Sequence, residues 1–195
     1  MFPALRPVAV LFLLAVVAGC TTPPPDQNRP EITFSHLPTI NLAVADVQVE
    51  NRFAAPLKAP HIEHQVPVAP AKAVIRWGQD RLKPAAEAGT ARLIINEASM
   101  VGEALAQSGG LKGVFTKEQS DRYRATIDAR LEVTDGQGVK HGFATATVSR
   151  SQTIREDATL TERETLEFEL VEKLMADFNR EMERNVRQHL QDWVR

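Results

Sequence analysis

Residues 123–134 read YRATIDARLEVT, and this stretch decides the fold. Its odd positions are apolar or aromatic and its even positions polar, which is the period of a β-strand with one buried face and one solvated face. Asp135-Gly136-Gln137-Gly138 follows and has the composition of a tight turn. Residues 139–154, rich in Thr, Val and Ala, then form a partner strand. The sequence therefore predicts a long antiparallel hairpin, with small inward residues that let a helix approach closely.

The last part of the chain is predicted to be one long amphipathic helix over residues 163–194. Thr161 and Glu164 have the spacing of a capping box at its start. Apolar residues recur at steps of three and four along one face; they are Leu170, Val171, Leu174, Met175, Phe178, Met182, Val186, Leu190 and Trp193. Such a helix would run roughly 48 Å, so it would either overhang a body about 38 Å across or bend near Asn179 or Asn185. The overhang would expose Leu190 and Trp193 as a possible contact for a partner.

The remaining segments complete a mixed architecture. Residues 40–51 read as a strand with a bulge near Asp46, residues 91–99 as a short apolar strand, and residues 100–115 as a glycine-rich loop. A helix is expected to start near Pro70 and to end at Pro84 to Gly89. We therefore predict a two-layer α+β domain, with a mostly antiparallel sheet of about four strands and two amphipathic helices on one face.

Composition narrows the function classes. The chain has 195 residues, a formal charge of −2, 43% hydrophobic residues and one cysteine. One domain is expected, with no intramolecular disulfide and no overall attraction to nucleic acid. The C-terminal forty residues carry 11 acids against 6 bases, which indicates either a solvated helix face or an acidic docking face.

The N-terminus has the features of an export signal. Arg6 precedes a short apolar run, residues 7–17, which is too short to span a bilayer. The run ends at Val17-Ala18-Gly19-Cys20, which resembles the bacterial lipobox. The resemblance implies cleavage before Cys20 and lipid attachment there through a diacylglyceryl thioether, with an amide-linked acyl chain. Two or more chains make a stable membrane anchor.

The resemblance also implies a compartment: the bacterial cell envelope, lipid-anchored and facing the periplasm. Thr21, where an aspartate usually retains lipoproteins in the inner membrane, favours the outer membrane. Residues 1–19 would be the signal peptide, residues 20–35 a lipidated, proline-rich tether, and residues 36–195 a single periplasmic domain. With Trp77-Gly78-Gln79-Asp80-Arg81-Leu82 in its first helix, the body loosely resembles auxiliary lipoproteins of ABC-type transport systems. That resemblance implies a non-enzymatic domain that contacts partner proteins.

No residues of the chain combine into a recognisable catalytic or cofactor motif. His61-x-x-His64 could supply two zinc ligands, but in an extended, proline-rich segment the two side chains point to opposite faces. We therefore expect no catalytic residue, no metal and no cofactor. The leading hypothesis is a non-catalytic envelope lipoprotein that binds an unidentified envelope protein through its sheet edge or overhanging helix. The alternatives are a lipid or small-ligand module with a cleft between sheet and helices, and a hydrolase.

Overall fold

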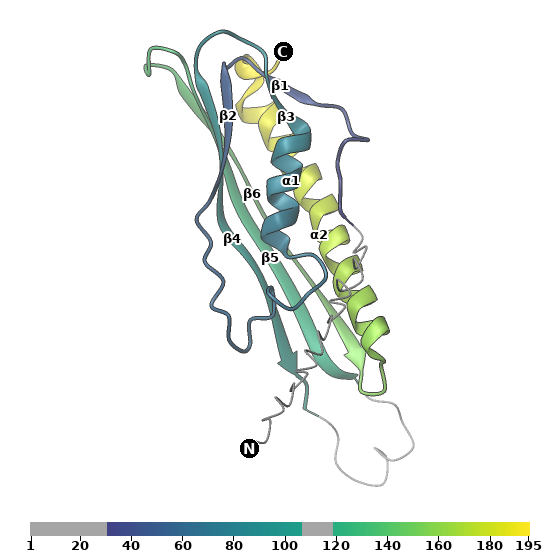
Figure 1. Cartoon of the computed structure of the whole chain (residues 1–195). Coiled ribbons are helices and arrows are strands. Elements are labelled where there is room, and N and C mark those ends of the chain that lie inside the picture. The colour runs from purple at the N-terminus through teal and green to yellow at the C-terminus, as the bar shows by residue number, and fades with distance from the viewer. Residues whose placement is uncertain (1–30, 107–118) are drawn as a thin grey trace, which may run out of the picture.

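The structure, a computed structural model, describes residues 31–106 and 119–195 (Figure 1). The elements in these residues are β1 (Ile40–Leu42), β2 (Asp46–Asn51), α1 (Pro70–Arg81), β3 (Leu82–Pro84), β4 (Thr90–Ala104), β5 (Gln119–Thr134), β6 (His141–Arg155), α2 (Leu160–His189) and a 3-10 turn, η1 (Gln191–Trp193).

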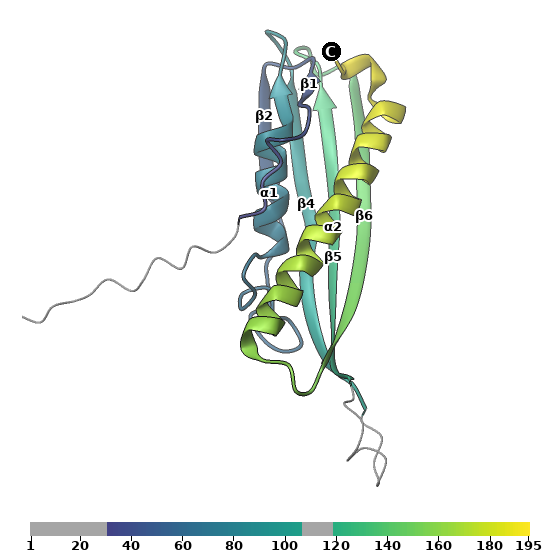
Figure 2. The ribbon, with the colours of Figure 1, turned by 90° about the vertical axis from the view of Figure 1, so that its right-hand side faces the viewer.

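A four-stranded sheet in the order β2-β4-β5-β6 forms one layer of the domain. β2 runs parallel to β4, and the other neighbours are antiparallel. β1 and β3 form a separate two-stranded parallel sheet. Both helices cover the same face of the large sheet, with α2 running obliquely across it (Figures 1 and 2). The predicted α+β architecture is confirmed.

The long β5–β6 hairpin forms half of the four-stranded sheet, with β6 at its edge. Residues of β5 at odd positions are buried from Tyr123 to Val133, whereas those at even positions are partly or fully exposed. On β6 the buried phase falls on Ala144 and Ala146, both 1% exposed. Because these side chains are small, α2 packs closely over β6, as the sequence predicts.

The two helices pack tightly on the sheet and on each other. A Cβ at Gly78 of α1 would lie 2.9 Å from side-chain atoms of both Val49 and Leu93, so only glycine allows this approach. Trp77, fully buried, donates its indole N–H to Oδ1 of Asn179 on α2 at 2.8 Å. Its ring meets Phe178 edge-on, with centroids 5.2 Å apart.

The predicted overhang of the last helix is wrong. α2 ends at His189, and the chain then turns back through η1 so that Val194 bridges Leu42. The amide of Ala43 donates to the carbonyl of Trp193 at 2.7 Å, which ties the C-terminus to the segment after β1. The capping box also differs, since Thr159 and Glu162 form it, not Thr161 and Glu164.

Two strand predictions need correction. Residues 100–104, expected in a loop, continue β4 because β5 supplies partners as far as the pair Ala104–Asp121. Residues 40–51 do not form one bulged strand. They divide into β1 and β2, which belong to different sheets.

Candidate interaction surface

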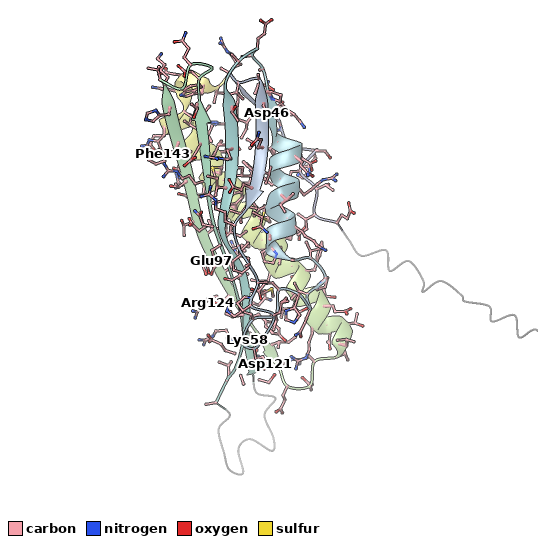
Figure 3. All side chains as sticks on the ribbon, turned by 60° about the vertical axis from the view of Figure 1, so that its left-hand side comes forward. Asp46, Lys58, Glu97, Asp121, Arg124 and Phe143 are labelled. Carbon is pink, nitrogen blue, oxygen red and sulfur yellow. The ribbon has the colours of Figure 1, made fainter. Side chains whose placement is uncertain are left out.

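One face of the large sheet is not covered by α1 and α2, and its side chains point away from the helices (Figure 3). Its side chains come from the phase opposite to the core on each strand. Among them are Asp46, Gln48 and Glu50 of β2, Arg92, Ile94 and Glu97 of β4, Arg122, Arg124, Thr126, Asp128, Arg130 and Glu132 of β5, and Phe143, Thr145, Thr147, Ser149, Ser151 and Thr153 of β6. We call this set the open face. Alternation alone predicts the β5 members.

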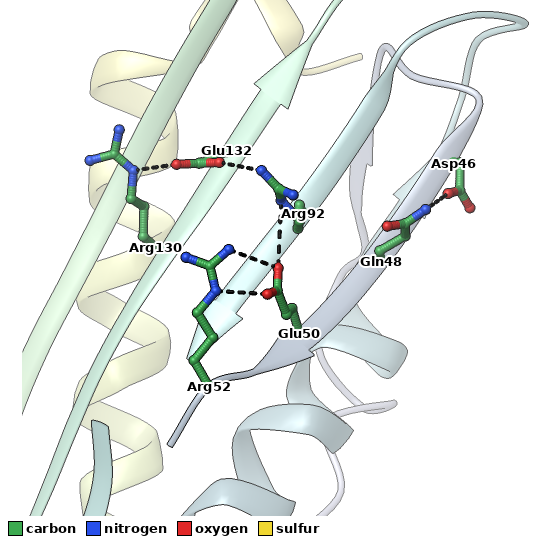
Figure 4. Close-up of polar contacts among 7 residues, drawn as sticks. All are labelled: Asp46, Gln48, Glu50, Arg52, Arg92, Arg130 and Glu132. Carbon is green, nitrogen blue, oxygen red and sulfur yellow. Dashed lines mark hydrogen bonds and ion pairs between the residues drawn. The ribbon is translucent and has the colours of Figure 1, made fainter. Parts of the chain in front are cut away.

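A chain of charged contacts crosses the open face from β2 to β5 (Figure 4). Nε of Arg52 lies 2.7 Å from Glu50, and Nε of Arg92 lies 3.8 Å from the same carboxylate. Arg92 also donates to Oε2 of Glu132 at 3.0 Å, and Arg130 donates to Oε1 of Glu132 at 2.9 Å. Three guanidinium groups therefore share two carboxylates, which leaves the cluster with one excess positive charge.

The arginines hold both glutamates in their charged form. Hydrogen bonds from Arg92 and Arg130 lower the pKa of Glu132, and the hydrogen bond from Arg52 lowers the pKa of Glu50. Ile94, between Glu50 and Arg130 in the register, is only 3% exposed although its strand phase points to the open face. The ion pairs thus hold the charged side chains of the cluster in place, and these side chains cover Ile94.

Phe143 extends the cluster onto β6. The guanidinium carbon of Arg130 lies 3.7 Å from the centre of the Phe143 ring, a cation–π contact. Phe143 remains 49% exposed. Aromatic and arginine side chains are the types enriched at protein interfaces, so this pair is a candidate contact point. Sequence reasoning missed it, because only the β5–β6 register brings Arg130 and Phe143 together.

Below this pair the polar side chains of the open face are linked by hydrogen bonds. Asp128 accepts from the amide of Asn96 at 3.1 Å and from the hydroxyl of Thr147 at 2.8 Å. The hydroxyls of Thr126 and Ser149 lie 3.1 Å apart. These cross-strand pairs fix the side chains at the β6 side of the face.

The C-terminal residues predicted to contact a partner lie against the body. Leu190 is fully buried in the core, and Trp193 packs against that core while partly exposed. Leu190 could therefore meet a partner only if the C-terminal segment left this position. Cys20, the predicted lipid attachment site, lies outside the described residues.

Several acids of the C-terminal region have basic partners on α2 or on β6. Glu169 contacts Lys173, Asp177 contacts Arg150 and Arg180, and Glu181 contacts Arg184. These pairs give the outer face of α2 alternating charges.

The two histidines of His61-x-x-His64 have separate partners. Nδ1 of His61 lies 3.0 Å from Glu63, whose side chain is 3% exposed, and Nε2 of His64 lies 2.9 Å from the amide of Gln65. Within residues 31–106 and 119–195 no group of three His, Cys, Asp or Glu side chains is placed to hold a metal ion.

A pocket of about 260 Å³ opens between the end of β6 and the first turns of α2. Its lining combines apolar surface with hydroxyl, amide and carboxyl groups, from Gln152, Thr161, Glu162, Thr165, Leu166 and Glu169. None of the helices in the described residues has the length and apolarity needed to cross a bilayer.

Comparisons with known proteins find distant structural similarity. No family model and no curated protein matches the sequence. Among solved structures, the chain is similar to a minor lipoprotein from Acinetobacter baumannii, at 16% identity and a TM-score of 0.37, over 74% of this chain and 94% of that one. It is also similar to the rare lipoprotein B from Shewanella oneidensis, at 13% identity and a TM-score of 0.35, over 71% of this chain and 92% of that one.

Proposed function

We propose that the chain is a non-catalytic lipoprotein of the bacterial envelope, anchored by acyl chains on Cys20, and that its domain binds a partner protein through the open face. The anchor rests on the order of charge, apolar run and small residues before Cys20. The binding role rests on one observation, the Phe143–Arg130 pair held on a sheet face that the helices leave uncovered. Thr21 favours the outer membrane.

The anchor is tested by Cys20→Ala. We expect the variant to lose acyl labelling and to leave the membrane fraction, with Thr22→Ala as a control that changes neither. Unchanged labelling and fractionation of Cys20→Ala would contradict the anchor. Separation of the two membranes by density, applied to the unmodified chain, tests the outer-membrane assignment.

The binding role is tested by placing a photo-crosslinking amino acid at Phe143 in cells. We expect one reproducible protein adduct, identified by mass spectrometry, that disappears when Arg130→Glu reverses the neighbouring charge. The matched control carries the crosslinker at Leu160, which is 72% exposed and begins α2 on the opposite side of the sheet. An adduct of the same identity from both positions, or none from Phe143, would reject the open face.

A further inference from the structure

β6 leaves one of its long edges without a partner strand in the described residues. It is the last strand of the order β2-β4-β5-β6, and only β5 pairs with it. The amide of Asp135 donates to the carbonyl of Lys140 at 2.9 Å, which makes these residues a hydrogen-bonded pair. Because such pairs alternate along an antiparallel ladder, the odd residues of β6 turn their N–H and C=O groups away from β5. Asn185 supports this assignment, since its side chain donates to the outward carbonyl of Thr145 at 2.7 Å.

The free part of this edge begins below Thr145. Thr147, Ser149, Ser151 and Thr153 are exposed, and their outward backbone groups have no hydrogen-bond partner among the residues that the structure describes. The segment spans about 20 Å of extended chain. None of these four residues is charged or proline, and the one charged side chain between them, Arg150, is paired with Asp177 of α2.

The opposite edge of the sheet is protected. β2 has six residues, among them Asp46 and Glu50, and the chain beyond it leads into Pro56 and Pro60. Short length, charge and proline all discourage pairing at a sheet edge. The contrast singles out β6 as the edge available for another strand.

We propose that a second copy of this chain pairs antiparallel along β6, with the two-fold axis at Ser151. This register sets Ser151 opposite Ser151 and Ser149 opposite Thr153 of the second copy, so hydroxyl side chains face hydroxyl side chains. Thr147 lies opposite Arg155 of the second copy, whose carbonyl accepts from the amide of Ala158, so the paired segment ends there. The interface is self-complementary, as a two-fold dimer requires. The two sheets become one, and both open faces lie on the same side.

The alternative axes fit less well. An axis at Arg150 would place the Arg150 side chains of the two copies directly opposite each other, where like charges repel. An axis at Ser149 would use the carbonyl of Thr145, which Asn185 already occupies. An axis at Ser151 preserves the hydrogen bond from Asn185 to Thr145 and keeps the Arg150 side chains of the two copies from lying opposite each other. Pairing at this edge is independent of the partner proposed for Phe143, because it uses backbone groups and not the open face.

The test is a disulfide at the axis in the full chain, oxidised in membranes from expressing cells. Opposed residues in a hydrogen-bonded pair have Cα atoms about 5.5 Å apart, within the range of a disulfide. Ser151→Cys should therefore double the apparent mass on a non-reducing gel. Thr126→Cys, one strand further in on the same face, and the unsubstituted chain should remain monomeric.

A second variant separates strand pairing from simple proximity. Proline at position 149 removes an outward N–H and no backbone hydrogen bond to β5, so Ser149→Pro should abolish the Ser151→Cys dimer while the domain still folds. Ser149→Ala loses the same hydroxyl contacts with Ala125 and Thr126 as the proline variant but keeps the N–H, and should preserve the dimer. A monomeric Ser151→Cys chain, an equal dimer from Thr126→Cys, or a dimer that survives Ser149→Pro would overturn the proposal. A disulfide to a different protein would also overturn it, and would leave the binding role of Phe143 to its own test.

Discussion

Arg81, at the end of α1, and Glu183, in α2, form an ion pair at 3.3 Å that joins the two helices. The Arg81 side chain is 1% exposed, and burial lowers its pKa, whereas Glu183 acts in the opposite direction. Neither Nε nor the Nη2 that faces Glu183 has a hydrogen bond of good geometry. The guanidinium therefore depends on Glu183 for its charge compensation.

Glu183→Ala should destabilise the domain, because it leaves a buried cation without its partner. Removing one member of a buried pair costs about 3–5 kcal/mol, and since Glu183 is 28% exposed we expect about 2–3 kcal/mol in urea unfolding. Glu169→Ala, which breaks an exposed pair with Lys173, should cost less than about 0.5 kcal/mol. The double variant Arg81→Met/Glu183→Leu should recover most of the loss. Equal effects of the two alanine variants would show that the buried charge is solvated.

Asn179→Leu tests the other link between the helices. The substitution would leave the buried indole N–H of Trp77 without an acceptor, at a cost of about 1–3 kcal/mol. Trp77→Phe removes the unpaired indole donor. It should therefore destabilise the Asn179→Leu chain less than it destabilises the unmodified chain. A double-mutant cycle of chemical unfolding measures this coupling. Strictly additive effects would mean that the hydrogen bond does not contribute.

Elements with a regular hydrophobic period could be predicted from the sequence. Features that depend on pairing between segments distant in the sequence could not. β5 and the apolar face of α2 show their periods over ten residues or more, so both were predicted with their buried residues. Gly102 and Glu103 resemble loop residues, yet they extend β4 because Tyr123 and Arg122 pair with them. The charged cluster of the open face depends on the parallel register of Glu50 against Ile94 and on Arg92 against Glu132. No local pattern encodes those registers.

The close approach of α2 to β6 leads to a prediction about size. Ala146 is 1% exposed beneath α2, so Ala146→Leu should overpack the interface and lower the free energy of unfolding by about 1–3 kcal/mol. Thr145→Leu is the matched control, since it adds bulk at the preceding residue of the same strand but on the open face. Its effect should stay within about 0.5 kcal/mol. If thermal unfolding showed that Ala146→Leu is as stable as the unmodified chain, α2 would have to shift away from the sheet to accommodate the larger side chain.

Glu167, in the second turn of α2, should make stability depend on pH. Burial, reinforced by the charge of Glu164, raises its pKa from 4.5 to about 7, although Arg163 acts to lower it. Between these values the folded chain holds a proton that the unfolded chain releases, so the free energy of unfolding falls as pH rises from about 4.5 to 7 and levels off above that. Because Glu167 is partly exposed, we expect a loss of about 1–3 kcal/mol across the window.

Glu167→Gln isolates this contribution, since glutamine has a similar shape and no charge at any pH. The variant should be more stable than the unmodified chain at pH 8, nearly equal to it at pH 4.5, and should flatten the slope between these values in urea unfolding. Glu172→Gln, at an exposed position of the same helix, should leave the slope unchanged. If Glu167→Gln and the unmodified chain lose stability in parallel from pH 4.5 to 7, the carboxyl of Glu167 does not carry the extra proton in the folded state.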